Sequence, residues 1–210
     1  MSNRDDESDD ENYDLEKNTG VNFDSTNGLL HQLEAAKNDF FSKQKKNIFF
    51  KSKQKSEYAD NVCANFDLND LLCHTMYVIP NTNKVYLNYV LFKQYANENN
   101  RERIVSFFVD LLRKTILEHT MIEFHLNMNT LSISATERYR KIVEMFAQCC
   151  LRDVTSFSKS ISIIYIYYTP HMIETILKFI QPFMDPTLVK KIVKYSKSES
   201  ENKLCELTVT

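Results

Sequence analysis

Glycine is almost absent from this chain of 210 residues, in which Gly20 and Gly28 are the only two. A loop that wraps the phosphates of a nucleotide needs several glycines, because only a residue without a side chain lets the backbone approach the phosphate closely. No such loop can form after residue 28. P-loop proteins, dinucleotide-binding folds and protein kinases are therefore excluded for the rest of the chain.

The overall composition suits one domain with a substantial core, since 43% of the residues are apolar and 12% are aromatic. The formal net charge is only -2, so we expect no nucleic acid partner. Five cysteines, without a Cys-x-x-Cys pair, indicate reduced thiols and no zinc ribbon. The acidic beginning does not resemble a signal peptide, and the apolar runs are shorter than the roughly 20 residues of a membrane helix. We expect a cytoplasmic protein, either soluble or peripheral to a membrane.

The first 28 residues are rich in aspartate and glutamate and poor in apolar side chains. Like charges repel, and little apolar surface is available to offset the entropy lost on ordering. We therefore predict a disordered acidic tail over residues 1–28. This tail either remains solvated or serves as an acidic docking segment.

Residues 29–57 are basic, with phenylalanines between the lysines. Apolar residues at helical spacing predict an amphipathic helix that Asn27 could cap. Such a segment either lies on an anionic membrane surface or packs its phenylalanines on the core while the lysines face solvent. The side chains that would reach a membrane are Lys43, Lys45, Lys46, Phe49 and Phe50.

The folded domain is expected over residues 58–196, followed by a flexible polar tail over residues 197–210. Its segments alternate between strand-like and helix-like apolar patterns, which predicts an α/β domain with a mixed, mostly parallel sheet flanked by helices. The expected strands are 73–79, 85–91, 121–128 and 160–168, and the expected helices are 101–119, 136–151, 171–181 and 187–194.

Residues with catalytic or metal-binding chemistry are scattered. Glu123 and His125 lie two apart on an expected strand and so share one face. A structural metal site needs about four convergent ligands, and no such spacing is present. Cys149 and Cys150 have no evident histidine partner, and the nucleophile motif of α/β-hydrolases is missing. We expect a non-enzymatic protein without a metal or another cofactor.

The segment from Ser160 to Ser196, SISIIYIYYTPHMIETILKFIQPFMDPTLVKKIVKYS, resembles the end of a CRAL-TRIO lipid-binding domain. The features that carry the resemblance are a buried strand, a Thr-Pro turn, a long apolar helix, a Pro-Phe pair, an Asp-Pro break and a Lys-Ile pair. Residues 124–146 resemble the central strand and the next helix of that family more loosely. The resemblance spans about residues 60–196 and is closest to a divergent branch that includes scaffold proteins and certain Rho GTPase-activating proteins.

The resemblance implies that a lipid or another hydrophobic ligand occupies a cavity above the sheet, under a gate helix over residues 171–181. Pro170 and Pro182 bound this helix, which supplies a hinge at each end. The same apolar residues would equally fill a solid core. The ligand-binding residues that the resemblance implies are Phe124, Leu126, Met128, Ile163 and Tyr165 on the sheet, Ile173, Ile176, Leu177 and Ile180 on the gate helix, and Lys191.

The sequence departs from the family pattern at the residues that read lipid head groups. Lys191 takes the place of the family's phosphate-reading lysine, but Lys159 lies near the place of a glutamate. Ile122 and Phe124 fall where other members read choline with hydroxyl groups. The resemblance therefore does not specify the head group. The alternative function is a protein-interaction scaffold of the same fold without a ligand cavity, for example one that binds a small GTPase.

Overall fold

The computed structural model describes residues 21–43, 51–152 and 157–208. Predictions on the first 20 residues, and on Lys45, Lys46, Phe49 and Phe50, lie outside this part. The expectation of disorder up to residue 28 is wrong for residues 23–28, which begin helix α1 (Phe23–Ser42). The Asn22 side chain caps this helix by accepting a 2.9 Å hydrogen bond from the Ser25 amide.

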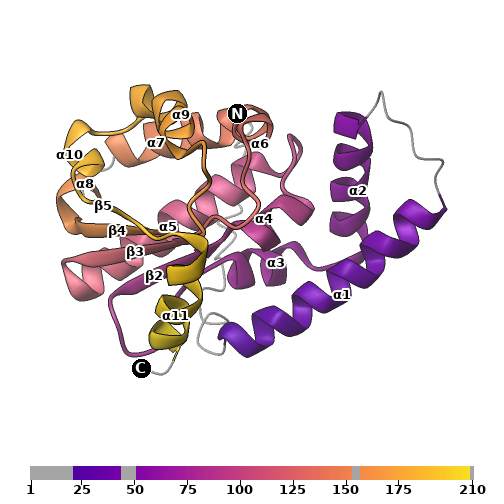
Figure 1. Ribbon diagram of the computed structural model, residues 1–210, viewed down its shortest axis with the longest axis horizontal. Coiled ribbons are helices and arrows are strands. Elements are labelled where there is room, and N and C mark those ends of the chain that lie inside the picture. The colour runs from indigo at the N-terminus through magenta and orange to yellow at the C-terminus, as the bar shows by residue number, and fades with distance from the viewer. Residues whose placement is uncertain (1–20, 44–50, 153–156, 209–210) are drawn as a thin grey trace, which may run out of the picture.

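A five-stranded sheet forms the centre of the described chain (Figure 1). The strands lie in sequence order, with β1 antiparallel to β2 and all later pairs parallel. This arrangement confirms the predicted mixed, mostly parallel sheet. The strands are β1 (Met76–Val78), β2 (Lys84–Asn88), β3 (Ile122–Asn127), β4 (Ile161–Tyr167) and β5 (Ile192–Lys194).

Helices flank the sheet, as the α/β pattern predicts. In Figure 1, α6, α7 and α9 lie above the strands, whereas α11 lies below them and α1 runs along the lower right. The remaining elements are α2 (Lys51–Asn65), α3 (Leu68–Thr75), α4 (Tyr89–Tyr95), α5 (Arg101–His119), α6 (Ile133–Arg138), α7 (Arg140–Arg152), α8 (Phe157–Ser160), α9 (Ile173–Ile180), η3 (Gln181–Phe183), α10 (Pro186–Val189) and α11 (Lys197–Thr208).

Both strands predicted near the start of the domain are shorter than expected. The stretch 73–79 begins inside α3, which Asp67 caps by accepting a 2.9 Å hydrogen bond from the Asp70 amide. The stretch 85–91 ends at Asn88, whose side chain accepts hydrogen bonds from the first amides of α4. Capping side chains thus override the strand-like apolar patterns at these two places.

The end of the predicted domain also differs from expectation. The stretch 187–194 does not form one helix, because after α10 the backbone pairs with β4 as β5. The Ile164 amide donates to the Lys191 carbonyl at 2.9 Å, and the Tyr195 amide donates to the Ile166 carbonyl at 2.9 Å. These bonds satisfy the backbone groups along the edge of β4 that faces β5. A helix over residues 187–194 would leave these groups unpaired.

The predicted flexible tail over residues 197–210 instead contains α11. Ser200 is fully buried, and its hydroxyl accepts a 2.6 Å hydrogen bond from the Tyr168 amide. Leu207 is buried in the main core. Residues 197–210 are mostly polar, so their sequence does not reveal that Ser200 and Leu207 are buried. Helix α11 packs on β4.

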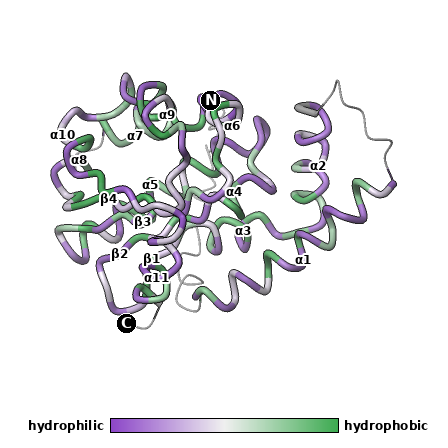
Figure 2. The backbone as a smooth tube through the Cα atoms, in the orientation of Figure 1, coloured by the Kyte–Doolittle hydropathy of each residue, from purple (hydrophilic) through white to green (hydrophobic). Residues whose placement is uncertain are grey.

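The hydrophobic core extends beyond residues 58–196 on both sides. Leu29 and Leu33 of α1 belong to it at one end, and Leu207 of α11 at the other. The Tyr58 hydroxyl donates a 3.0 Å hydrogen bond to the Leu33 carbonyl and so joins α1 to α2. Figure 2 shows hydrophobic residues along the central strands. Among the residues that the structure describes, no helix is both long and apolar enough to cross a bilayer.

Candidate ligand-binding site

A cavity of about 370 Å³ lies between one face of the sheet and the helices that cover it. Phe124 and Leu126 of β3 and Ile161 and Ile164 of β4 contribute the sheet side of this cavity. The β3–β4 register pairs Phe124 with Ile164, which brings these side chains to one face. The cavity therefore rests on apolar side chains of two central strands.

Helix α7 supplies one wall. Val143, Phe146, Ala147 and Cys150 line the cavity, and their spacing of three and four residues places them on one side of the helix. All four are half-buried. The helical periodicity in the sequence does reveal this apolar side of α7, but it does not reveal that the side faces a cavity.

The segment from α9 to α10 covers the cavity. Ile180, Phe183, Met184 and Leu188 contribute apolar side chains to the lining. The guanidinium carbon of Arg140 lies 5.6 Å from the centre of the Phe183 ring, a cation–π contact that joins this cover to α7. Helix α9 ends at Ile180, and the chain continues through Pro182 in the short helix η3, which forms part of the cover.

The polar part of the lining comes from Ser158, Lys159 and Asp185. The Asp185 carboxylate accepts hydrogen bonds from the Thr187 hydroxyl at 2.6 Å and from its amide at 2.8 Å. These bonds, with that from Ser158 and the nearby charge of Lys191, lower the pKa of Asp185 below its ordinary value. Lys159 is exposed and is the only cation in the described lining of this cavity.

Lys191 lies behind this polar edge and does not line the cavity. Its ammonium group donates hydrogen bonds to the Ser158 carbonyl at 3.0 Å and to the Ile161 carbonyl at 2.5 Å. The lysine, which directly precedes β5, therefore joins this segment to α8 and to the start of β4. A head-group role for Lys191 stays a prediction.

The structure brings three of the ten residues implied by the resemblance into this cavity: Phe124, Leu126 and Ile180. The other seven lie outside its lining. They are Met128, Ile163, Tyr165, Ile173, Ile176, Leu177 and Lys191.

The alternation of β4 explains why Ile163 and Tyr165 are absent. They pair with Glu123 and His125 of β3, and so share the sheet face opposite the cavity. A register irregularity between Ile122 and Glu123 shifts the alternation relative to β3. The sequence carries no signal for this shift, so on β4 it does not reveal that Ile164 lines the cavity in place of Ile163.

The gate helix contributes less than expected because most of its apolar side chains pack elsewhere. Ile173 and Ile176 are buried, and α9 packs on α6 and α7. Ile180, one turn after Ile176, reaches the cavity. The first turn of α9 thus anchors the helix, while its end covers the cavity.

The sheet face opposite the cavity holds Glu123 and His125. His125 is buried, shares a 2.8 Å hydrogen bond with the Tyr167 hydroxyl through Nδ1, and lies 3.4 Å from the Glu123 carboxylate through Nε2. Its ring stacks on that of Tyr165. Burial, and to a smaller extent the charge of Lys84, lowers the pKa of His125 to about 4. The described residues contain no cluster of ligands for a metal ion.

Comparison with known proteins identifies the family. None of the curated proteins matches this chain. Residues 81–208, more than half of the chain, match the model of the CRAL/TRIO domain. This range includes β2 to β5 and every element that lines the cavity. The chain therefore belongs to the CRAL/TRIO domain family, whose members bind lipophilic ligands, as the C-terminal segment of the sequence predicts.

Proposed function

We propose that the protein binds one single-chain lipid with an anionic head group in the cavity between the sheet and α7, α9 and α10. The observation that carries this proposal is the cavity itself, about 370 Å³ in volume and lined mostly by apolar side chains under a helical cover. Pockets for small ligands have volumes of roughly 300–1,000 Å³. The cavity lies near the lower end of that range, which favours one acyl chain over a lipid with two.

The head-group preference follows from the polar edge of the cavity. Lys159 supplies a positive charge there, and the Asp185 carboxylate, which stays ionised, already accepts hydrogen bonds from the Thr187 hydroxyl and amide. The ammonium group of Lys191 is engaged by two backbone carbonyls. A carboxylate at the end of an acyl chain complements the one cation of the described lining. A fatty acid is the simplest ligand of this class.

An exchange function requires the cover to open. Ile180 and Phe183 lie on either side of Pro182, at the junction of α9 and η3. Movement about this junction would expose the cavity while the first turn of α9 stays packed on its neighbours. The ligand would then enter from a membrane surface. Of the five residues predicted to reach a membrane, the structure describes only Lys43, which forms a 2.6 Å ion pair with Asp39.

The alternative function as a scaffold without a cavity is less well supported. It requires solid packing between the sheet and the cover, whereas this space holds about 370 Å³. Binding of a small GTPase would use an outer surface and is compatible with an occupied cavity.

Mass spectrometry of an organic extract of the purified full chain tests the proposal. We expect about one fatty acid per chain in the native protein. Ala147→Phe places a ring in the cavity and should reduce the recovered lipid at least several-fold. Gln148→Phe introduces the same ring on the exposed side of α7 and should leave recovery unchanged. Equal recovery from both variants would contradict the cavity assignment.

A competition between oleic acid and oleyl alcohol tests the head group separately. The native chain should prefer the acid, and Lys159→Glu should remove that preference while the alcohol still binds. Lys178→Glu, on the exposed side of α9, is the matched control. If Lys159→Glu retains the preference for oleic acid, the proposed role of Lys159 is wrong.

A further inference from the structure

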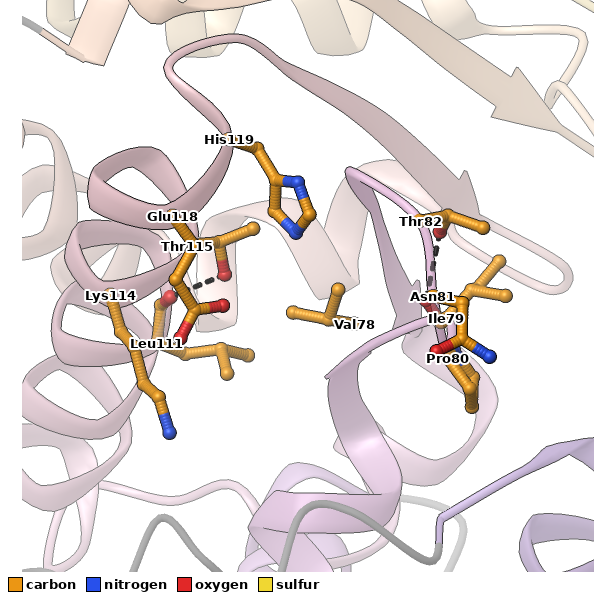
Figure 3. Close-up of a pocket in the computed structure, with 10 residues that line it drawn as sticks. All are labelled: Val78, Ile79, Pro80, Asn81, Thr82, Leu111, Lys114, Thr115, Glu118 and His119. Atoms are coloured by element: carbon orange, nitrogen blue, oxygen red, sulfur yellow. Dashed lines mark hydrogen bonds between the residues drawn. The ribbon is translucent and has the colours of Figure 1, made fainter.

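A second cavity, of about 340 Å³, lies between α5 and the turn that joins β1 to β2. Figure 3 shows Val78 projecting toward the helix, with Leu111 on the facing side and Pro80, Asn81 and Thr82 along the turn. Leu111 is buried and Val78 is half-buried. The groove thus has an apolar floor and shares no lining residue with the ligand cavity.

One side of this groove is the edge of the sheet that β1 forms among the described strands. Strand β1 is the first in the strand order and pairs only with β2 among the described strands. The Ile79 amide donates a 2.9 Å hydrogen bond to the Lys84 carbonyl. Backbone groups of successive residues in an antiparallel pair alternate in direction, so the amide and carbonyl of Val78 point away from β2. These two groups are available to a further strand, up to the stop that Pro80 imposes.

The other side of the groove presents two opposite charges. Lys114 and Glu118 of α5 line it, are exposed, and form no ion pair with any described residue. Four residues along an α-helix advance by about 6 Å, and two residues along a strand advance by about 6.6 Å. An extended chain beside α5 therefore brings alternate side chains opposite Lys114 and Glu118.

One exposed apolar residue, Met121, follows the end of α5 near the groove. Its side chain is 41% exposed. The Met121 carbonyl accepts a 2.9 Å hydrogen bond from the Asn83 side chain, which places Met121 beside the β1–β2 turn. Met121 therefore adds exposed apolar surface near the turn.

We propose that this groove binds an extended peptide segment of a partner protein, which adds a strand to the edge of the sheet at Val78. The segment carries an acidic and a basic residue two positions apart, facing Lys114 and Glu118, with apolar residues near them. Backbone pairing would supply affinity, and the two charges would fix the register, as in other cases of strand addition. The proposal does not depend on the lipid proposal, because the two sites have separate linings.

Two acetylated and amidated nonapeptides test the proposal on the full chain. The first is Thr-Val-Thr-Glu-Val-Lys-Thr-Val-Thr, and the second exchanges its Glu and Lys. A third peptide with Gln at both places is the neutral control. Titrations followed by amide NMR signals should shift Val78 with one charge order, at an affinity about fivefold above the neutral peptide, since exposed ion pairs are individually weak. Methylation of the backbone nitrogens of that peptide should abolish the shift.

The double variant Lys114→Glu and Glu118→Lys distinguishes specific peptide binding in this groove from nonspecific binding elsewhere. Both residues are exposed, so the fold should persist, and the preferred charge order of the peptide should reverse. An unchanged preference, or no shift at Val78 with any peptide at millimolar concentration, overturns the proposal. Self-association of the chain through this edge, detected by sedimentation without peptide, would assign the groove to a second copy and would also overturn it.

Discussion

Phe124 on β3 and Ile180 at the end of α9 line the same cavity from two different layers of the fold. The sheet fixes Phe124 through its pairing with Ile164, whereas Ile180 depends on the packing of α9. The volume between the layers is thus maintained by a helix whose own anchors, Ile173 and Ile176, lie outside the cavity. Because Ile173 and Ile176 hold α9 in place from outside the cavity, the helix can cover the cavity without filling it.

Ile180→Asp should reduce the affinity for a single-chain lipid by about tenfold or more, because a carboxylate in an apolar cavity loses its hydration. Titration with a fluorescent fatty acid measures the change. Lys178→Asp introduces the same charge on the exposed side of α9 and should have little effect. Matching losses in the two variants would show that Ile180 does not contact the ligand.

Lys191→Met should lower the free energy of unfolding by about 1–3 kcal/mol, because the carbonyls of Ser158 and Ile161 lose their donor. Lys190→Met, at the neighbouring exposed position, should change stability little. Urea denaturation of the three proteins checks this. Loss of lipid binding without loss of stability would instead indicate that Lys191 reads the head group.

His125 should make the protein less stable as the pH falls from about 6.5 to 4. Its pKa in the folded chain is about 4, below the ordinary 6.5, so the unfolded chain binds the proton first. The contribution of His125 to the free energy of unfolding is fully present above pH 6.5. It decreases by up to about 3 kcal/mol by pH 4, and below that pH it stays constant.

Urea denaturation between pH 4 and 8 measures this dependence. His125→Gln removes the titrating group and should flatten the curve in that interval. His171→Gln, at an exposed position, should leave the slope as it is. The same slope in native protein and in His125→Gln would disprove the assignment.

Leu207→Asp should destabilise the protein by about 2–4 kcal/mol, because Leu207 belongs to the buried core. Asn202→Asp, on the exposed side of α11, should be nearly neutral. Thermal denaturation compares the two. If both variants melt with the native protein, α11 does not contribute to the folded domain.

The sequence pattern predicts the fold class because two periodicities are clear: alternation or continuous apolar runs in the strands, and spacings of three and four in helices such as α5. It fails where one polar side chain decides the outcome. Asn88 ends β2 by capping α4, and Ser200 fixes α11 by binding the Tyr168 amide. Each of these contacts is one hydrogen-bonded polar group, and the bond between Ser200 and Tyr168 joins distant parts of the chain. The hydropathy pattern therefore does not predict them.

The site is only partly predictable for a similar reason. On β3 the structure places Phe124 and Leu126 in the lining of the cavity, and the sequence shows that they share one face because they alternate with polar neighbours. On β4 nearly every residue is apolar or aromatic, so the sequence does not show which side chains face the cavity. The register of β4 against β3 decides that question in favour of Ile164 over Ile163.

Native mass spectrometry of the full chain, incubated with oleic acid and then desalted, tests the central claim most directly. The cavity between the sheet and α9 predicts a single complex with one bound fatty acid, and predicts that Ala147→Phe prevents it while Gln148→Phe does not. A native chain that stays at its unliganded mass at every lipid concentration would contradict the claim.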